Sequence, residues 1–388
     1  MTPPMARQTP WILAAVFSTS LGVGLVFGFE PPLIAMVLNR AHESTVAIGS
    51  VIAVSLVAIV LVGPLYPRLI ARFGLQRSVV GGVGCSILIL VAMSRWNSLP
   101  GWLVLRVLTG CAVGLAWIAS EIWMNRATPA GARGTVMGLY GAVFSLGTVG
   151  GPLLLEFTGT IGARPFMVGA ACLALTLLPL ALLRQVAASS ARHAAPHTQR
   201  LQDLPRLLPL APAVMAAALI AGLVESADLS LLPLLGLRDG LDERAALQLL
   251  TIFLAGNVVL QLPIGLLADR CGRRLMLGVC ALASGVGPLL LQGCIHEPLL
   301  LWPLLFVWGG TLYAFYSQGV ALLGEEFAPA DVAGANTLFV MIYCCGGVIG
   351  PSVGGLAMDL WPRNGLPVLL SAAALALLAG LILGRGRA

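Results

Sequence analysis

The sequence predicts an all-α membrane protein of twelve transmembrane helices in two pseudo-symmetric six-helix bundles, and three observations lead to this fold class. Of the 388 residues, 58% are hydrophobic and 10% are charged, against roughly 25% charged in soluble domains. Twelve apolar runs are each long enough, at about 1.5 Å per residue, to cross about 30 Å of hydrocarbon. The two halves of the chain also repeat each other.

The twelve expected spans follow one another with short polar connections. In order they cover residues 11–38, 46–67, 78–94, 101–124, 134–157, 165–184, 209–236, 245–267, 275–292, 299–322, 333–357 and 365–384. The first run is too long for a cleaved signal peptide and continues through Glu30-Pro31-Pro32 without a small-residue cleavage pattern. It is therefore expected to stay in the protein as a helix.

The basic residues predict the orientation in the membrane. All 22 are arginines: 15 flank the spans on the side of both termini, six lie on the other side, and Arg106 lies within a span. The positive-inside rule then predicts a multi-pass protein of the inner (cytoplasmic) membrane with both termini in the cytoplasm. Basic loops facing anionic lipid account for this charge, so no nucleic-acid partner is expected.

The internal repeat predicts the domain organisation. At a shift near 199 residues, Gly74 aligns with Gly272, Gly110 with Gly309, Pro129 with Pro329, Gly134 with Gly334, and Gly147-x-x-x-Gly151-Pro152 with Gly346-x-x-x-Gly350-Pro351. The predicted units are an N-terminal bundle of residues 1–184, a linker of residues 185–208 and a C-terminal bundle of residues 209–388, working as a monomer.

Small residues in the fifth and eleventh spans predict close helix packing, because membrane helices associate where their backbones approach closely. These residues are Gly138, Gly147, Gly151, Pro152, Gly346, Gly350 and Pro351.

A short charged segment lies between the eighth and ninth apolar runs. The run Gly265-Leu266-Leu267-Ala268-Asp269-Arg270-Cys271-Gly272-Arg273-Arg274 resembles the cytoplasmic loop signature of the major facilitator superfamily of secondary transporters. The resemblance extends over essentially the whole chain. Within the family, the chain is similar to a bacterial subgroup of drug-efflux and sugar-transporter-like members. It implies two parallel six-helix halves that rock about a central substrate site.

Within this loop, Gly265 is expected to let the eighth span approach a neighbour. Asp269 is expected to accept hydrogen bonds at the start of another helix, where the helix dipole favours an anion. The resemblance implies that this helix is the fifth, whose start carries Arg133, so the gating loop of Gly265, Asp269, Arg270, Gly272, Arg273 and Arg274 would latch the cytoplasmic side. The first-half copy has Ala71 in place of the aspartate, which predicts a weaker latch there.

Ionisable side chains inside spans are costly and indicate a site or pathway. They are Glu30, Arg106, Glu121, Glu156, Glu225 and Asp228. The resemblance implies that spans 1, 4, 7 and 10 surround the central cavity. Glu30 and Arg106 lie at similar depths and are expected to pair.

Glu225 and Asp228 share one helix face, and Asp228 aligns with Glu30 in the repeat. Carboxylates close together in a low-dielectric medium disfavour full ionisation, so one of Glu30, Glu225 and Asp228 is expected to bind and release a proton. A permanently paired carboxylate is the alternative.

Two further motifs are similar to family patterns. Arg106-Val107-Leu108-Thr109-Gly110 resembles the fourth-helix signature of proton-driven members, in which the arginine serves proton handling or an anionic substrate, although Thr109 replaces the usual glutamine. Gly138-x8-Gly147-x3-Gly151-Pro152 resembles an exporter pattern but lacks its last two glycines. The alternative is a glycine–proline kink that bends and packs the helix and has no bearing on the direction of transport. Glu121 lies in Trp117-x-x-x-Glu121-x-Trp123-x-Asn125 and is also a candidate.

Aromatic and amide side chains on the cavity spans are candidate ligand contacts, with packing as the alternative. They are Trp117, Tyr140, Phe144, Asn257, Gln261, Tyr313, Tyr316, Gln318, Asn336 and Tyr343. Aromatic faces with carboxylates suit cations that have large apolar bodies, whereas sugars normally require more amides.

The sequence thus predicts a proton-coupled antiporter that exports a small organic molecule, preferably a cationic or amphiphilic drug-like compound. Proton-coupled uptake of an organic solute or anion, with Arg106 as an anion clamp, is one alternative, and a transporter-like sensor or scaffold is another. No enzymatic motif, metal site or cofactor is expected, with the proton as coupling ion. The expected partners are the lipid bilayer, protons and the substrate.

Overall fold

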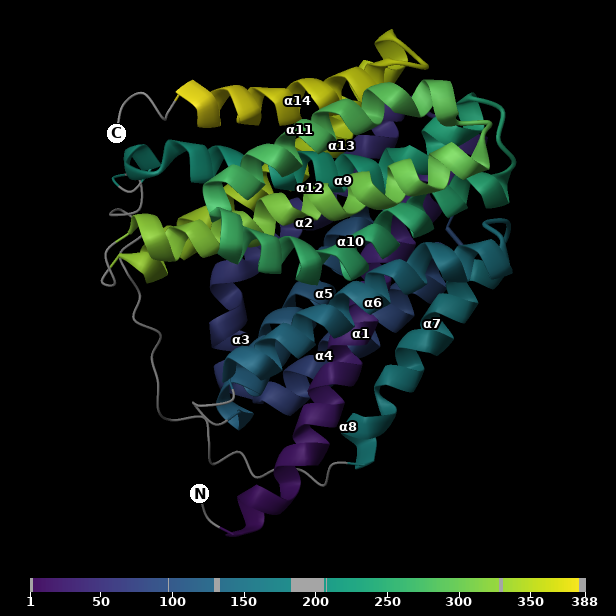
Figure 1. The fold of residues 1–388 in the computed structure, drawn as a ribbon. Helices are drawn as coiled ribbons and strands as arrows, with labels where there is room; N and C mark the ends of the chain where they lie inside the picture. Colours follow the sequence, from purple (N-terminus) through teal and green to yellow (C-terminus); the bar gives the residue numbers. More distant parts are fainter. Residues whose placement is uncertain are drawn as a thin grey trace. The chain divides into compact units, whose positions relative to one another are not determined.

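The structure, a computed structural model, describes residues 3–96, 98–128, 133–182, 206, 208–327 and 331–383. Within these residues every regular element is a helix (Figure 1). The first half holds α1 (Pro3–Arg40), α2 (Thr45–Val62), the 3₁₀-helix η1 (Gly63–Leu65), α3 (Tyr66–Phe73), α4 (Leu75–Met93), α5 (Leu99–Ala127), α6 (Arg133–Thr158), α7 (Arg164–Thr176) and α8 (Leu178–Leu182). The second half holds α9 (Pro212–Arg238), α10 (Glu243–Cys271), α11 (Arg273–Cys294), α12 (Pro298–Glu326), α13 (Val332–Leu360) and α14 (Gly365–Leu383).

The helices match the expected spans. In the described part of the chain, eleven helical segments are long and apolar enough to cross a bilayer, and the shorter apolar segment Arg164–Leu180 stands at the sixth position. The all-α membrane fold predicted from the sequence is therefore confirmed.

The second span is interrupted in a way that the hydropathy pattern does not reveal. After α2, the chain forms the 3₁₀-turn Gly63–Leu65 and then the separate helix α3. Pro64 has no backbone N–H to donate, and Pro67 follows in the first turn of α3, so the regular hydrogen-bond ladder is broken here.

Two repeat-related glycines end helices within the cytoplasmic-loop signature and its first-half copy. Gly74 follows α3 with φ 84° and Gly272 follows α10 with φ 93°. Both lie where a side chain would be strained, which explains why the repeat retains glycine at both positions.

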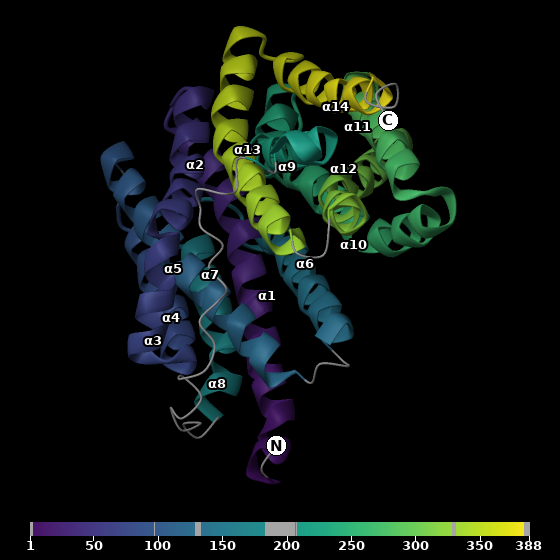
Figure 2. The same ribbon diagram turned by 90° about the vertical axis from the view of Figure 1, so that its left-hand side faces the viewer.

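The chain forms two compact units. The first comprises Met1–Leu33 and Val54–Ala194, and the second comprises Ile34–Ala53 and Ala195–Ala388. The second unit thus contains α9 to α14 and also the corner formed by the end of α1 and the start of α2 (Figure 2). The predicted bundle boundaries at residues 184 and 209 stay a prediction.

Each unit is assembled around helix pairs that touch backbone to backbone. In the first unit a Cβ at Gly24 or Gly147 of the α1–α6 pair would overlap a carbonyl oxygen, of Phe144 or Leu21 respectively. In the second unit the same contacts are made in the α9–α13 pair, where Gly222 faces the Tyr343 carbonyl and Gly346 faces that of Leu219. A second matching contact joins Gly110 to Ser55 and Gly309 to Phe253. The sequence repeat is therefore a repeat of packing.

Candidate functional site

In the first unit, the expected pairing of Glu30 with Arg106 is confirmed. Arg106 of α5 donates through Nη1 to Oε2 of Glu30 on α1 and through Nη2 to Oγ of Ser55 on α2. The side chains of Arg106 and Glu30 are 4% and 2% exposed. Arg106 thus links three helices, and the Glu30 carboxylate compensates its charge.

A small cavity of about 30 Å³ adjoins this ion pair. It is lined by Val26, Phe27, Pro31, Ser55, Ile59, Arg106, Thr109, Gly110 and Val113. The hydroxyl of Thr109, which replaces the glutamine of the family signature, is buried and has no hydrogen-bond partner among the described residues. The cavity is the size of roughly one water molecule, too small for an organic substrate.

Three aromatic rings of the first unit form a half-buried cluster. Trp117 lies 5.6 Å from Phe27 and 6.1 Å from Phe144, measured between ring centroids, and Phe27 lies 5.8 Å from Phe144. Phe27 was missed by the sequence reasoning, although it lies one turn before Glu30 on α1. Glu121 lies one turn beyond Trp117 on α5 and is partly exposed.

Tyr140 is more deeply buried than these three rings and takes part in two hydrogen bonds. Its hydroxyl lies 2.8 Å from the Ser120 hydroxyl, and its carbonyl oxygen accepts from Ser20 at 3.1 Å. Both contacts join neighbouring helices of the first unit, so Tyr140 contributes to packing, and its contact with a ligand stays a prediction.

In the second unit, Glu225 and Asp228 on α9 lie among tyrosines. The Tyr343 hydroxyl donates to Oε2 of Glu225 at 2.7 Å, and the Tyr343 ring lies 4.9 Å from that of Tyr316. The buried hydroxyl of Tyr313 lies within electrostatic reach of both carboxyl groups.

Asp228 differs from the other charged groups in its surroundings. Its side chain is completely buried, and neither carboxyl oxygen has a hydrogen-bond partner among the described residues. Its electrostatic neighbour is Glu225, which carries the same charge when ionised. A group in this position is stable when neutral or when a cation lies beside it.

The amide candidates are dispersed through the second unit. Gln261 donates to the Asn257 side chain at 2.9 Å, one turn away on α10. Each amide thereby satisfies part of the hydrogen-bonding capacity of the other. Gln318 is buried within α12, and Asn336 on α13 is exposed. These four residues form no shared polar cluster in the described contacts.

In the gating loop, Arg273 contacts two acidic residues. Asp269 accepts from Arg273 at 3.1 Å, and Arg273 also lies 3.3 Å from Glu325 at the end of α12, while Arg270 is exposed. A Cβ at Gly265 would meet no described atom within 4 Å. The expected approach of Gly265 to the fifth span stays a prediction.

The latch between Asp269 and Arg133 stays a prediction. The Arg133 side chain lies outside the described residues. Arg274, the last residue of the signature, lies within electrostatic reach of Glu326, so both basic residues at the start of α11 have acidic neighbours on α12.

The packing residues behave as predicted where they are described. Gly147 and Gly151 contact the α1 backbone, and Gly346 and Gly350 contact the α9 backbone. Pro152 and Pro351 stand inside continuous helices. The surroundings of Gly138 lie outside the described residues.

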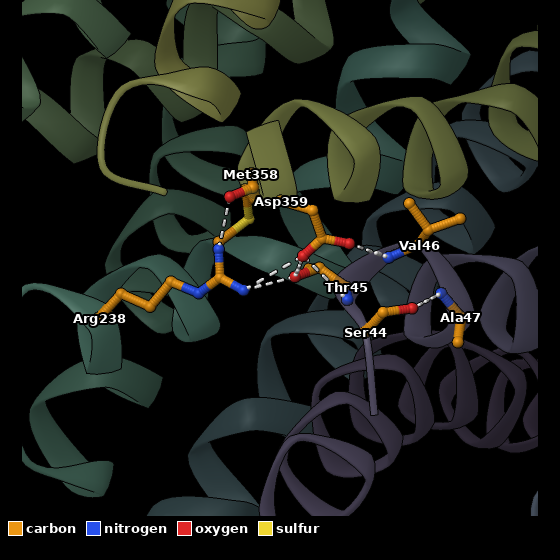
Figure 3. A network of polar contacts seen from close by, with 7 residues as sticks. All are labelled: Ser44, Thr45, Val46, Ala47, Arg238, Met358 and Asp359. Carbon is orange, nitrogen blue, oxygen red and sulfur yellow. Dashed lines mark hydrogen bonds and ion pairs between the residues drawn. The ribbon is translucent and has the colours of Figure 1, made fainter. Parts of the chain in front are cut away.

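A polar network that the sequence reasoning missed lies in the second unit (Figure 3). Asp359, near the end of α13, accepts from the backbone N–H groups of Thr45 and Val46 at 3.2 and 3.1 Å and from the Thr45 hydroxyl. Arg238 donates to the Met358 carbonyl at 2.8 Å and also to the Thr45 hydroxyl. No spacing pattern in the sequence signals these contacts.

Comparison with known proteins identifies the family but no substrate. The chain is 22% identical over 382 residues to an uncharacterized MFS-type transporter, YfkF, of Bacillus subtilis (strain 168), with 98% of this chain and 96% of that protein covered. It is 26% identical to the uncharacterized MFS-type transporter YE1530 of Yersinia enterocolitica, with 83% and 82% covered.

Solved structures share the fold. The nucleoside transporter NupG matches with a TM-score of 0.80 at 14% identity, covering 96% of this chain and 98% of that one. The D-xylose-proton symporter matches with a TM-score of 0.72 at 16% identity, covering 94% and 97%. The model of the Major Facilitator Superfamily matches residues 12–249 and 240–387. This chain is therefore a secondary transporter, without enzymatic function, that belongs to the Major Facilitator Superfamily.

Proposed function

We propose that this protein is a proton-coupled antiporter that exports a small organic cation or amphiphile, and that Asp228 with Glu225 forms its exchange site. The observation that carries the proposal is the complete burial of Asp228 without a hydrogen-bond partner among the described residues. An isolated charge in such a place is costly, so Asp228 is expected to hold a proton in this state. A cationic substrate would replace that proton.

The first half supports this assignment by contrast. Glu30, the repeat counterpart of Asp228, is neutralised by Arg106 and is therefore unsuited to binding a second cation. Arg106 in turn donates to Glu30 and Ser55, which argues against its use as an anion clamp. Of the three candidate carboxylates, the two on α9 remain for coupling.

Aromatic rings support a cationic or amphiphilic substrate. In the second unit Tyr343 donates to Glu225, and Tyr316 packs against Tyr343. In the first unit Phe27, Trp117 and Phe144 form the cluster. The faces of such rings attract cations and bury apolar bodies, which a sugar site built on amides would not do.

Transport in proteoliposomes tests the proposal. Tetraphenylphosphonium, ethidium, xylose and benzoate are supplied with an imposed pH gradient in either direction. The expected result is movement of a cation against proton flow, abolished in Asp228→Asn and strongly reduced in Glu225→Gln. Glu297→Gln, at an exposed loop position, is the matched control. Transport by Asp228→Asn at the rate of the wild type would contradict the proposal.

Proton-coupled symport is the second candidate, because a buried carboxylate can couple proton flow to solute movement in either direction. It predicts that solute enters together with protons in the same assay. A sensor or scaffold predicts no flux of any probe under either gradient and no effect of Asp228→Asn. We place the protein as a monomer in the inner membrane with both termini in the cytoplasm, with protons, substrate and lipid as its partners.

A further inference from the structure

The hydroxyl of Thr109 in α5 lacks the partner that buried threonines of helices commonly use. Such a hydroxyl donates to the carbonyl oxygen one turn earlier in the same helix. Thr19 of α1 does so, donating to the Ala15 carbonyl at 2.9 Å. Thr109 is 2% exposed, and its hydroxyl makes neither this bond nor any other among the described residues. The side chain instead lines the cavity of about 30 Å³ beside the buried ion pair.

Three polar side chains contribute to the wall of this cavity. They are Thr109 and Arg106 of α5 and Ser55 of α2, and the last two are already joined by a bond from the guanidinium to the Ser55 hydroxyl. Genuinely empty cavities in proteins are lined by apolar groups, whereas a polar cavity of sufficient size holds water. The composition of this wall therefore indicates an occupied site.

Size and charge select the occupant. One water molecule takes up about 30 Å³ in the liquid and needs two to four polar partners, so both the volume and the wall suit a single molecule. The charge of Arg106 is compensated by Glu30. An additional cation or anion would bring an unpaired charge into a buried place, which is costly. A neutral ligand with donor and acceptor groups is thus favoured.

The second half has an aromatic filling at the corresponding place. The matching glycine contacts of the two helix pairs align Ser55 with Phe253 and Thr109 with Trp308. The rings of Phe253 and Trp308 pack edge to face with their centroids 5.0 Å apart. Leu305 stands there at the position of the arginine. Small hydroxyl-bearing residues and an open volume thus occur in the half that carries the buried guanidinium.

We propose that this cavity binds one ordered water molecule and that Thr109 specifies the site. The water bonds to the Thr109 hydroxyl and to the Ser55 or Arg106 side chain, and so gives Thr109 the partner that no described residue provides. It adds a link between α2 and α5 beside the ion pair. The site goes beyond the proposed transport function and does not depend on proton exchange at Asp228.

Thermal unfolding of the purified full-length protein tests the site through the sign of one change. Thr109→Val exchanges the hydroxyl for a methyl group of similar size. In a dry cavity the substitution would remove an unsatisfied buried hydroxyl and raise the melting temperature. With a water bound, it removes one of the partners of that water and is expected to lower the melting temperature by several degrees.

Thr19→Val is the matched control, because Thr19 is 1% exposed and bonds only within its own helix in the described contacts. The Ala15 carbonyl keeps its helical N–H partner after this change, so the melting temperature is expected to stay near that of the wild type. A rise for Thr109→Val, or a fall no larger than that of Thr19→Val, would overturn the water site.

X-ray footprinting in nanodiscs detects the water itself, because radicals formed from a bound water oxidise the side chains around it. Val26 and Val113 line the cavity, whereas Val214 and Val224 are buried in α9. The cavity valines are expected to be oxidised several-fold faster. Thr109→Leu, with a longer apolar side chain, is expected to abolish this excess without changing the rates in α9. Equal rates at all four valines, or an excess that survives Thr109→Leu, would contradict the proposal.

Discussion

The Glu30 carboxylate and the Arg106 guanidinium form an ion pair from which solvent is almost excluded, with 2% and 4% of the two side chains exposed. Ser55 accepts a second guanidinium hydrogen, so α1, α2 and α5 meet at one cation. The counterpart of Glu30 in the second half, Asp228, has no such cation among the described residues. The buried carboxylate of the first half is thus neutralised by an arginine, whereas its counterpart in the second half has no cationic partner among the described residues.

Glu30→Gln is expected to destabilise the protein. Removing one partner of a buried pair leaves the other charge uncompensated, at a cost of about 3–5 kcal/mol. A marked fall in the melting temperature of the purified protein would show this, and Glu30→Gln with Arg106→Gln should recover much of the loss.

The exposed pair of Arg40 and Glu243 is the control for this prediction. Their nitrogen and oxygen atoms are 3.0 Å apart, and their side chains are 38% and 33% exposed. Exposed ion pairs contribute about 0–1 kcal/mol, so Glu243→Gln should barely change the melting temperature. Equal effects of Glu30→Gln and Glu243→Gln would contradict a special role for the buried pair.

Asp228→Asn is expected to leave the fold as stable as the wild type while it abolishes transport. The substitution removes no hydrogen bond among the described residues, since both carboxyl oxygens lack partners there. Thermal unfolding of the purified variant checks the prediction, with Glu225→Gln, which perturbs the bond from Tyr343, as the comparison. A large fall in melting temperature for Asp228→Asn would show that Asp228 is a structural group.

Gly346→Ala is expected to prevent close packing of α9 and α13. The added Cβ would overlap the Leu219 carbonyl oxygen, and a backbone atom cannot move aside as a side chain can. Gly293→Ala is the matched control, because a Cβ at Gly293 meets no described atom within 4 Å and alanine favours the helix by up to about 1 kcal/mol. Comparable folded yields of the two variants in size-exclusion chromatography would refute the packing argument.

Trp117→Leu is expected to weaken binding of a cationic ligand by roughly 2- to 30-fold, the equivalent of about 0.5–2 kcal/mol for a cation–π contact. The ring of Trp117 lies beside those of Phe27 and Phe144, so the substitution would remove one of the three rings of the cluster. Equilibrium binding of the cation that the transport assay identifies measures the change. Trp302→Leu, at an exposed position on α12, should leave the affinity unaltered.

The fold was largely predictable because its main signal is local. Apolar run length predicted twelve spans, of which eleven are membrane-length helices in the described part of the chain and the sixth is a shorter segment. Repeated glycines predicted close packing of α6 and α13, although not that α1 and α9 are their partners. The interruption of the second span at Gly63–Leu65 was not anticipated, because hydropathy averages over the loss of a few hydrogen bonds at Pro64.

The candidate site was predictable only in part. Equal depth predicted the pairing of Glu30 with Arg106, since an unpaired charge in a span is costly. The second partner, Ser55, and the cap that Asp359 provides to Thr45 come from segments far apart in sequence. Bonds to backbone N–H groups and hydroxyls leave no compositional signal.

The backbone contacts at Gly24, Gly147, Gly222 and Gly346 have an evolutionary consequence. Contacts of this kind depend on the absence of a side chain at a few positions and are indifferent to the chemistry of the remaining ones. After duplication, residues that point elsewhere from the same helices were therefore free to diverge. Glu30 and Asp228 illustrate that freedom: a lineage can change what it carries by substituting a handful of side chains while inheriting its scaffold intact.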